Sequence, residues 1–186
     1  PDYVVETLHE YLAAKIQDFI ERVERKESPR LIIKVPPQHG KSTLSSRYGP
    51  AYYLGRNPKR SVALMSYSAD WATSLSRDAR NILTSEAFQR VFPDVELAPD
   101  AQAADEWQLT TKSGGVKMKA VGRDGGITGR PADILIVDDP IKNRDEAYSD
   151  TVLKNIKEGF GPNFRTRVQM GGGILIVATQ WSHAEL

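Results

Sequence analysis

The hydrophobic positions of this chain alternate between two spacings. In the first 25 residues they recur every three or four positions, which is the period of an amphipathic helix with its charged residues on the other face. The same period returns in residues 44–54, 68–83 and 152–160. Between these segments stand short continuous apolar runs, which are typical of strands buried on both faces of a parallel sheet. The runs are 31–35, 61–66, 134–137 and 174–178.

This alternation predicts an α/β fold with a mainly parallel central sheet and helices on both faces. Residues 107–121 interrupt it with two strand-like runs around Ser113-Gly114-Gly115, which predict an antiparallel hairpin at the sheet edge. Residues 92–106 show little periodicity and are interpreted as a loop, and the three glycines at 171–173 as a turn. Gly161-Pro162 is expected to break the helix that precedes it.

The chain has 186 residues, a net charge of +1 and no cysteine. This length suits a single domain, 1–186. The net charge as a whole gives no argument for a nucleic-acid or membrane surface, and the lack of cysteine excludes a disulfide framework. No apolar run approaches the roughly 18 residues of a membrane span. Because the chain begins at Pro1 and ends at Leu186 soon after an apolar strand, we expect it to be part of a longer protein.

A phosphate-binding loop is predicted at 35–43, where a strand-like run leads into a loop ending Gly40-Lys41-Ser42 and a helical segment follows. Gly40 lets the backbone turn so that amides point at phosphate oxygens, and the helix start adds its positive dipole end. Lys41 is expected to reach the β- and γ-phosphates, and the Ser42 hydroxyl to hold Mg²⁺. Pro50 should kink the following helix. The nucleotide-binding residues predicted here are Pro37, Gln38, His39, Gly40, Lys41, Ser42 and Thr43.

Two carboxylates follow the apolar run 134–137, in the order Asp138-Asp139. Parallel sheets bind ligands beyond the carboxyl ends of their strands, and unpaired buried charges are too costly to serve packing alone. We expect Asp138 to hold Mg²⁺ together with Ser42, and Asp139 to orient or deprotonate the water that attacks the γ-phosphate. The alternative is that one of the two aspartates only caps a loop.

Other polar side chains have candidate roles around such a site. Thr179 and Gln180 follow the apolar run 174–178, where they would touch the γ-phosphate and report its loss. Gln17, on the N-terminal helix, is either a surface residue or a group that reads the edge of adenine. An arginine that stabilises the transition state would complete the set, and the candidates Arg123 and Arg130 lie in a glycine-rich stretch. If such an arginine acts on a neighbouring subunit's nucleotide, the active form is a ring.

Together these motifs resemble the ATPase domain of tailed-bacteriophage terminase large subunits, the motors that package double-stranded DNA into a capsid. The resemblance covers almost the whole chain and rests on residues 36–42, 54–58, 66–68, 126–140 and 178–181. The family commonly carries an arginine where Gln38 stands and another where Gln180 stands. These departures shift the expected catalytic arginine to Arg130.

The resemblance implies a three-layer P-loop NTPase fold of the additional-strand, RecA-like type, with one strand between the phosphate-loop strand and the Asp-Asp strand. It implies ATP and Mg²⁺ as cofactors, and double-stranded DNA, a portal protein and a small terminase subunit as partners. A pentameric ring that works in the host cytoplasm during virus assembly, neither secreted nor membrane-bound, is part of the same expectation. The family's nuclease activity resides in a C-terminal domain, so no DNA cleavage is expected of residues 1–186.

Three other functions are alternatives to a packaging ATPase. A guanine-nucleotide switch needs an Asn/Thr-Lys-x-Asp motif, which neither residues 111–114 nor residues 142–145 supply. A fragment of a RecA-type DNA helicase or translocase stays open, because a second similar domain could lie outside this chain. A non-catalytic nucleotide-binding module also stays open, although it would not need Asp139 beside Asp138.

Overall fold

The computed structural model describes residues 5–110, 116–127 and 131–179. In this part of the chain a seven-stranded sheet has the order β1-β7-β6-β2-β5-β4-β3. The strands are β1 (Arg30–Lys34), β2 (Val62–Ser66), β3 (Leu97–Gln102), β4 (Glu106–Leu109), β5 (Val116–Gly122), β6 (Ala132–Asp138) and β7 (Val168–Ala178). The helices are α1 (Thr7–Glu24), α2 (Gly49–Arg56), α3 (Ala69–Leu83), α4 (Glu86–Val91), α5 (Arg144–Ala147) and α6 (Asp150–Asn163). A π-helix, η1 (Thr43–Tyr48), precedes α2, and a 3₁₀ turn, η2 (Arg165–Arg167), precedes β7.

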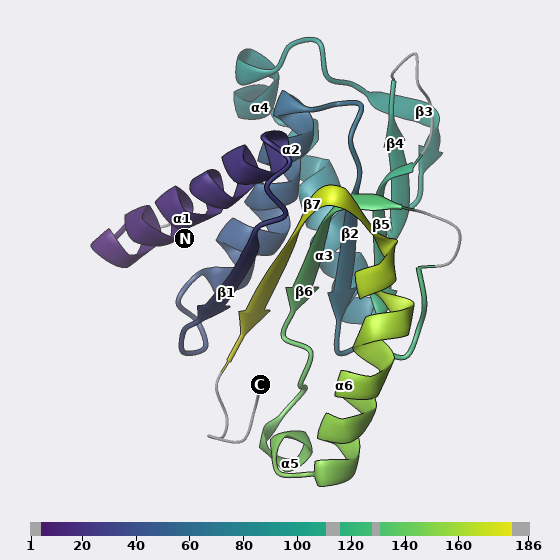
Figure 1. The fold of residues 1–186 in the computed structure, drawn as a ribbon. Coiled ribbons are helices and arrows are strands. Elements are labelled where there is room, and N and C mark those ends of the chain that lie inside the picture. Colours follow the sequence, from purple (N-terminus) through teal and green to yellow (C-terminus); the bar gives the residue numbers. More distant parts are fainter. Residues whose placement is uncertain (1–4, 111–115, 128–130, 180–186) are drawn as a thin grey trace.

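Five neighbouring strands run parallel and end at one edge of the sheet. These are β1, β7, β6, β2 and β5, whose ends point toward the bottom of Figure 1. Strands β5, β4 and β3 then pair antiparallel, which confirms the predicted edge hairpin on a mainly parallel sheet. Strand β7 lies between β1 and β6, so the expected additional strand stands between the phosphate-loop strand and the Asp-Asp strand.

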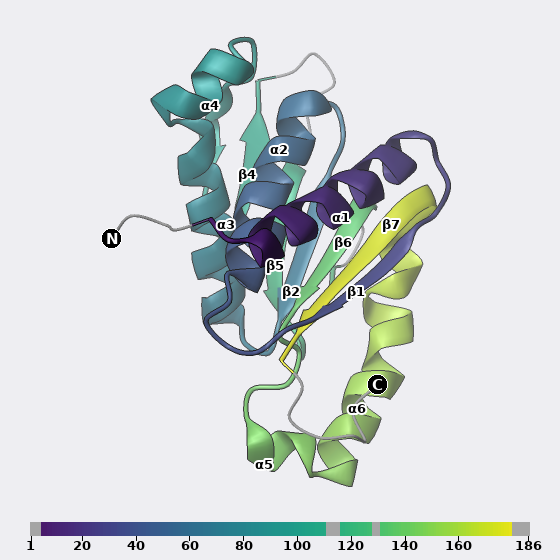
Figure 2. The same ribbon diagram turned by 90° about the vertical axis from the view of Figure 1, so that its left-hand side faces the viewer.

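Hydrophobic cores lie on both faces of the sheet because successive side chains of a buried strand point to opposite faces. Leu64 of β2 packs in the larger core with residues of α1, α2 and α3, and the next residue, Met65, packs in a smaller core with Phe164. Figure 2 shows α1, α2 and α3 on one side of the sheet and α6 on the other. The predicted three-layer α/β architecture is confirmed.

The helices begin where the sequence places polar caps. Ser68 and Ser149 accept hydrogen bonds from the amides of Trp71 and Val152, which satisfies a free donor in the first turn of α3 and of α6. Trp71 itself is only partly buried against the larger core.

The interpretation of residues 92–106 as a loop is wrong, because residues 97–102 form strand β3. This strand pairs with β4 through Leu97 and Leu109 and through Gln102 and Trp107, with an irregular register between them. Pro99 cannot donate to a ladder, but β3 is the last strand in the order and has a strand neighbour on one side only. Edge position therefore permits a strand that the local pattern does not indicate.

The glycines at 171–173 do not form a separate turn, since β7 runs through all three. Gly171 has a φ of 86°, and a Cβ at Gly173 would lie 2.5 Å from Phe19 Cζ. Glycine is therefore required here because α1 packs too closely on β7 to leave room for a side chain. The predicted helix break at Gly161-Pro162 agrees with the structure to within one residue, because α6 has Pro162 in its last turn and ends at Asn163.

Candidate nucleotide and metal site

The loop 35–42 leads from β1 into η1 at the edge where the parallel strands end (Figure 1). Gln38 and Gly40 have φ values of 65° and 72°. Glycine takes this left-handed conformation without strain because it has no Cβ, whereas a glutamine takes it at a cost. His39 Nδ1 lies 2.7 Å from the carbonyl oxygen of Pro37, which holds the ring against the loop. The predicted phosphate-binding residues thus form a tight turn directly before a helix.

The helix after this loop changes type at Pro50. Residues 43–48 form η1, and the amide of Gly49 donates to the carbonyl of Leu44, a π-helical hydrogen bond. Pro50 lacks an amide hydrogen and stands in the first turn of α2, so the predicted kink takes the form of this change. Single π-helical turns frequently occur at functional sites.

Asp138 at the end of β6 is fully buried and receives two hydroxyl hydrogen bonds. Ser42 Oγ donates to Oδ1 over 3.0 Å, and Ser46 Oγ donates to Oδ2. Burial raises the pKa of the Asp138 carboxyl to about 6; the charge of Asp139 adds to the rise, and the hydrogen bonds from Ser46 and Ser42 oppose it. An ionised carboxylate at this depth calls for a cation beside it.

Lys41 is brought together with Asp139 and Thr179 from two other strands. Its Nζ lies 3.1 Å from Asp139 Oδ2 and donates to Thr179 Oγ1 over 2.8 Å. The amide of Thr179 donates to Asp139 Oδ1 over 2.7 Å, so the three residues close a ring of contacts. Lys41 is 7% exposed, and this pairing satisfies its buried charge.

Asp139 is held in a backbone conformation that few non-glycine residues adopt. Its φ is 40°, its amide donates to Val177 O over 2.8 Å, and its carbonyl accepts from the amide of Tyr67 over 3.3 Å. Strain of this kind persists where surrounding contacts fix it, and it concentrates at functional sites. The backbone turns the second aspartate away from the strand and toward Lys41.

The donor set suits Mg²⁺. Ser42 and Asp138 offer a hydroxyl and a carboxylate oxygen side by side, and Mg²⁺ binds few protein oxygens while keeping waters and substrate phosphates. In the described residues no group of three or more His, Cys, Asp or Glu side chains could hold a metal ion. The oxygens of Ser42 and Asp138 therefore fit an ion that also binds the phosphates of a ligand.

Gln17 lies on the exposed face of α1, where its Nε2 donates to Glu21 Oε1 over 2.9 Å. It borders a groove of about 210 Å³ that Leu44, Tyr48 and Tyr52 also line. Leu44 and Tyr48 belong to η1, which directly follows the phosphate-binding loop. The structure thus places Gln17 beside an apolar groove next to this loop.

Of the remaining predicted residues, Thr43 opens η1, while Gln180 and Arg130 lie outside the described residues. Arg123 is engaged within its own chain, because it donates to both carboxylate oxygens of Glu146 over 2.6 and 2.7 Å. It also donates to the carbonyl of Pro140 over 2.9 Å. In this arrangement Arg123 ties α5 to the segment after Asp139.

Ser46 is the residue of this site that the sequence analysis missed. It is fully buried and contacts the same carboxylate as Ser42. A signal was present, since residues four apart on a helix share a face and both are serines. Its partner Asp138 is far away in sequence, so only the packing of η1 against β6 reveals the contact.

We expect Ser46→Ala to weaken Mg²⁺ binding by about 10- to 100-fold, the usual cost of losing a residue that orients a metal ligand. The physical reason is that Asp138 Oδ2 would lose its hydroxyl donor in a buried site. Titration of Mn²⁺ in place of Mg²⁺, followed by its paramagnetic signal with ADP present, measures the affinity directly.

Ser45→Ala is the matched control for this substitution. Ser45 is equally buried and its Oγ lies 3.1 Å from Ser46 Oγ, but its hydroxyl donates to the carbonyl of Lys41 over 2.7 Å instead of to Asp138. Equal losses of metal affinity in the two variants would show that Ser46 has no particular role in orienting Asp138.

The strand order, the loop before η1 and the paired aspartates together define an α/β domain of the P-loop NTPase class. A sequence model of the family described as "Terminase large subunit, T4likevirus-type, N-terminal" matches residues 32–160. The chain belongs to this family. The matched region includes the loop, both aspartates and Arg123.

The solved structures include one close in fold, the crystal structure of the HK97 bacteriophage large terminase, with a TM-score of 0.54 and 15% sequence identity. The match covers 96% of this chain and 34% of that chain. At this identity the likeness shows the fold, and this chain spans about a third of the length of that protein. A search of curated protein sequences finds no match. Among the described residues, no helix is long and apolar enough to cross a membrane.

Proposed function

We propose that this chain is the ATPase motor domain of a terminase large subunit, which hydrolyses ATP with Mg²⁺ to drive double-stranded viral DNA into a procapsid. Membership of the terminase large subunit family supports the packaging role. The observation that carries the ATPase activity is the convergence of Lys41, Ser42, Asp138, Asp139 and Thr179 at the ends of β1, β6 and β7.

In the proposed reaction the loop amides and Lys41 bind the β- and γ-phosphates, while Ser42 and Asp138 hold Mg²⁺. The bound ion supplies positive charge that offsets the charge on the phosphates. Lys41 is already at the site and paired with Asp139, so an incoming phosphate competes with a carboxylate for the same ammonium group. Phosphate binding releases Asp139 from this ion pair.

Asp139 then orients the attacking water and accepts its proton. The hydrogen bond from the amide of Thr179 leaves Oδ2, the oxygen now facing Lys41, available for this role. Thr179 is the proposed sensor because it contacts both Lys41 and Asp139, so loss of the γ-phosphate would change its surroundings. Gln180, the next residue, is proposed to share this role.

The groove beside Gln17 is the proposed site for the adenine ring. It adjoins the start of the helix that follows the loop, and its aromatic and aliphatic lining suits a flat base. Gln17 can offer both a donor and an acceptor to the edge of adenine once it leaves Glu21.

Arg130 is the proposed catalytic arginine, supplied to the nucleotide of a neighbouring subunit in a pentameric ring. The engagement of Arg123 with Glu146 favours Arg130 over Arg123. A portal protein and a small terminase subunit are the proposed partners, and the host cytoplasm during virus assembly is the proposed location.

Mixed oligomers test the proposed action of Arg130 between subunits. We expect Arg130→Ala protein to be inactive alone but to restore ATP turnover when mixed with inactive Lys41→Ala protein, because each subunit supplies what the other lacks. Phosphate release across a series of mixing ratios is the measurement. Arg144→Ala, at an exposed arginine of α5, is the control that should stay active alone. Mixtures no more active than the separate variants would rule out an arginine acting between subunits.

The proposed function as a whole is tested by ATP turnover of the wild-type chain with Mg²⁺ or with a chelator, and with or without duplex DNA. Hydrolysis that requires Mg²⁺ supports the proposal. Hydrolysis that persists unchanged in a Lys41→Ala variant would exclude it.

A further inference from the structure

The end of the sheet opposite the nucleotide site is rich in basic side chains. The parallel strands begin here, and α1, α2 and α6 end here (Figure 1). Some of these cations are neutralised by nearby carboxylates. Arg22 and Arg25 share the carboxylate of Glu27, while Arg56 pairs with Glu24 and Arg60 with Asp133.

Other cations at this end have no carboxylate partner among the described residues. We call those that lie around the beginning of β7 the basic end surface, namely Lys26, Arg30, Arg165 and Arg167. Arg30 Nη1 donates only to carbonyl oxygens, those of Ser28, Pro29 and Gly172. These bonds fix its position without cancelling its charge.

The four residues surround the beginning of β7. A Cβ added at Gly171 would lie 2.7 Å from Lys26 Cβ, and Arg30 Nη1 lies 3.1 Å from Gly172 O, so both contact this segment. Arg165 and Arg167 form the 3₁₀ turn that directly precedes β7. Burial lowers the pKa of the Arg30 guanidinium, and the positive charge of Arg165 adds to this effect, as expected for neighbouring like charges.

Stability of the chain does not account for this cluster. A cation near the C-terminal end of a helix is stabilised by the helix dipole, which applies to Lys26 after α1 and to Arg165 after α6. Arg30, however, begins a strand, where no helix end offsets its charge. Like charges that repel one another are stabilised by an anion from outside the chain.

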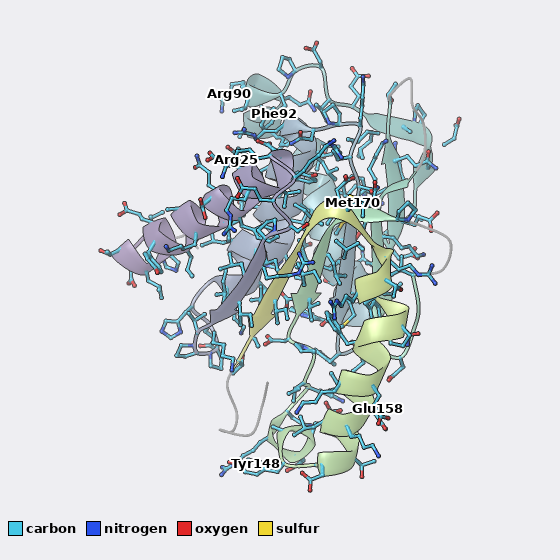
Figure 3. All side chains as sticks on the ribbon, in the orientation of Figure 1. Arg25, Arg90, Phe92, Tyr148, Glu158 and Met170 are labelled. Carbon is cyan, nitrogen blue, oxygen red and sulfur yellow. The ribbon has the colours of Figure 1, made fainter. Side chains whose placement is uncertain are left out.

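We infer that the basic end surface binds the phosphate backbone of double-stranded DNA. The like charges of the basic end surface indicate a ligand with several negative charges. That this ligand is duplex DNA rests on the proposed packaging function. An acidic protein partner is less favoured, because stable protein interfaces have an apolar centre and Met170 is the only fully exposed large apolar side chain among the described residues of this end. Figure 3 labels Met170 near the beginning of β7.

The surface and the nucleotide site are separate but share two strands. Arg30 begins β1, whose other end leads to Lys41, and Arg167 precedes β7, whose other end leads to Thr179. A strand of five residues spans roughly 17 Å at about 3.3 Å per residue, so one phosphate ligand cannot occupy both places. DNA binding at this surface is therefore expected without nucleotide, and the two strands offer a direct link between DNA and the ATP site.

The test is the affinity of the chain for a short duplex of mixed sequence, measured by fluorescence anisotropy without nucleotide at several salt concentrations. We expect the double variant Arg165→Gln/Arg167→Gln to bind more weakly to every sequence. The slope of log affinity against log salt should fall by about 1.8, since each lost phosphate contact accounts for about 0.9. Arg30 is left unchanged because its loss would also remove backbone hydrogen bonds.

Two further variants keep the test decisive. Arg77→Gln/Arg90→Gln removes the same charge from exposed arginines of α3 and α4 and should leave the slope unchanged. Arg165→Lys/Arg167→Lys keeps the charge and should retain most of the binding, which separates loss of charge from misfolding. Equal affinities of the glutamine variant and the α3/α4 control would overturn the inference, as would a wild-type chain that binds no duplex.

An acidic partner gives a different result. If the glutamine variant loses affinity for polyglutamate but keeps its affinity for duplex DNA, the surface binds protein and the inference is wrong. A test of the proposed ATPase activity is independent of this DNA-binding test. Lys41→Ala should keep DNA binding without nucleotide while losing turnover, so each proposal can fail without the other.

Discussion

Replacing Lys41 with alanine is expected to lower ATP turnover by about 10²–10³-fold, the usual effect of removing one preorganised group that stabilises transition-state charge. Lys41 Nζ lies 3.1 Å from Asp139 Oδ2 and donates to Thr179 Oγ1 over 2.8 Å, so its charge lies at the end of the sheet where the phosphates are proposed to bind. The alanine variant would lose this charge and leave Asp139 unpaired. Phosphate release at saturating ATP and Mg²⁺ is the measurement.

Lys34→Ala is the control for this prediction. Lys34 ends β1 close to the same loop, but its side chain is exposed. Its loss should leave turnover within a few-fold of wild type, and thermal melting should show both variants folded. Normal turnover in Lys41→Ala would mean that the loop at 35–42 does not bind the reacting phosphates.

Asp139→Asn should lose hydrolysis by about 10²–10⁴-fold, the range typical for loss of a general base, while keeping ATP binding. Asparagine has nearly the same shape and can still accept the hydrogen bond from the amide of Thr179, so the local backbone should persist. The neutral side chain no longer holds Lys41 in an ion pair, which should favour ATP binding slightly. Binding of a fluorescent ATP analogue, measured beside turnover, separates these two effects.

Asp145→Asn is the control for this prediction. It removes one carboxylate from an exposed position of α5, so turnover and ATP binding should stay as in the wild type. If Asp139→Asn loses Mg²⁺-dependent ATP binding before it loses turnover, Asp139 is a metal ligand and the base lies elsewhere. Turnover unchanged in Asp139→Asn would exclude Asp139 as the base altogether.

The sequence predicted those helices and strands whose own hydrophobic pattern shows which side chains are buried. A short apolar run such as 134–137 favours a buried strand because of its length and its β-branched residues, and the helical period of α1 favours a core on one side. Other features depend on residues that are distant in the sequence. Strand β3 exists because β4 supplies its hydrogen bonds, and the glycines of β7 are set by the approach of Phe19 from α1.

The candidate site divides in the same way. Ser42 and Asp138 could be paired in advance, because a hydroxyl after a phosphate loop and a carboxylate ending a buried strand have few other uses, and the structure joins them over 3.0 Å. The contact of Ser46 with Asp138 and the engagement of Arg123 with Glu146 could not be predicted. Both depend on which side chains the packing of helices brings within reach.

The sequence by itself determined the class of this protein. The loop ending Gly-Lys-Ser and the buried strand ending Asp-Asp carry polar groups that packing does not need. Both motifs can be recognised in the sequence without the tertiary structure. Only the tertiary structure decided how these groups meet. With β7 between β1 and β6, Thr179 reaches both Lys41 and Asp139. The starts of β1 and β7 bring together, at the opposite end, the cations of the basic end surface, which have no carboxylate partner in the described part of the chain. Strand order sets both arrangements, and it depends on long-range pairing that no local pattern records.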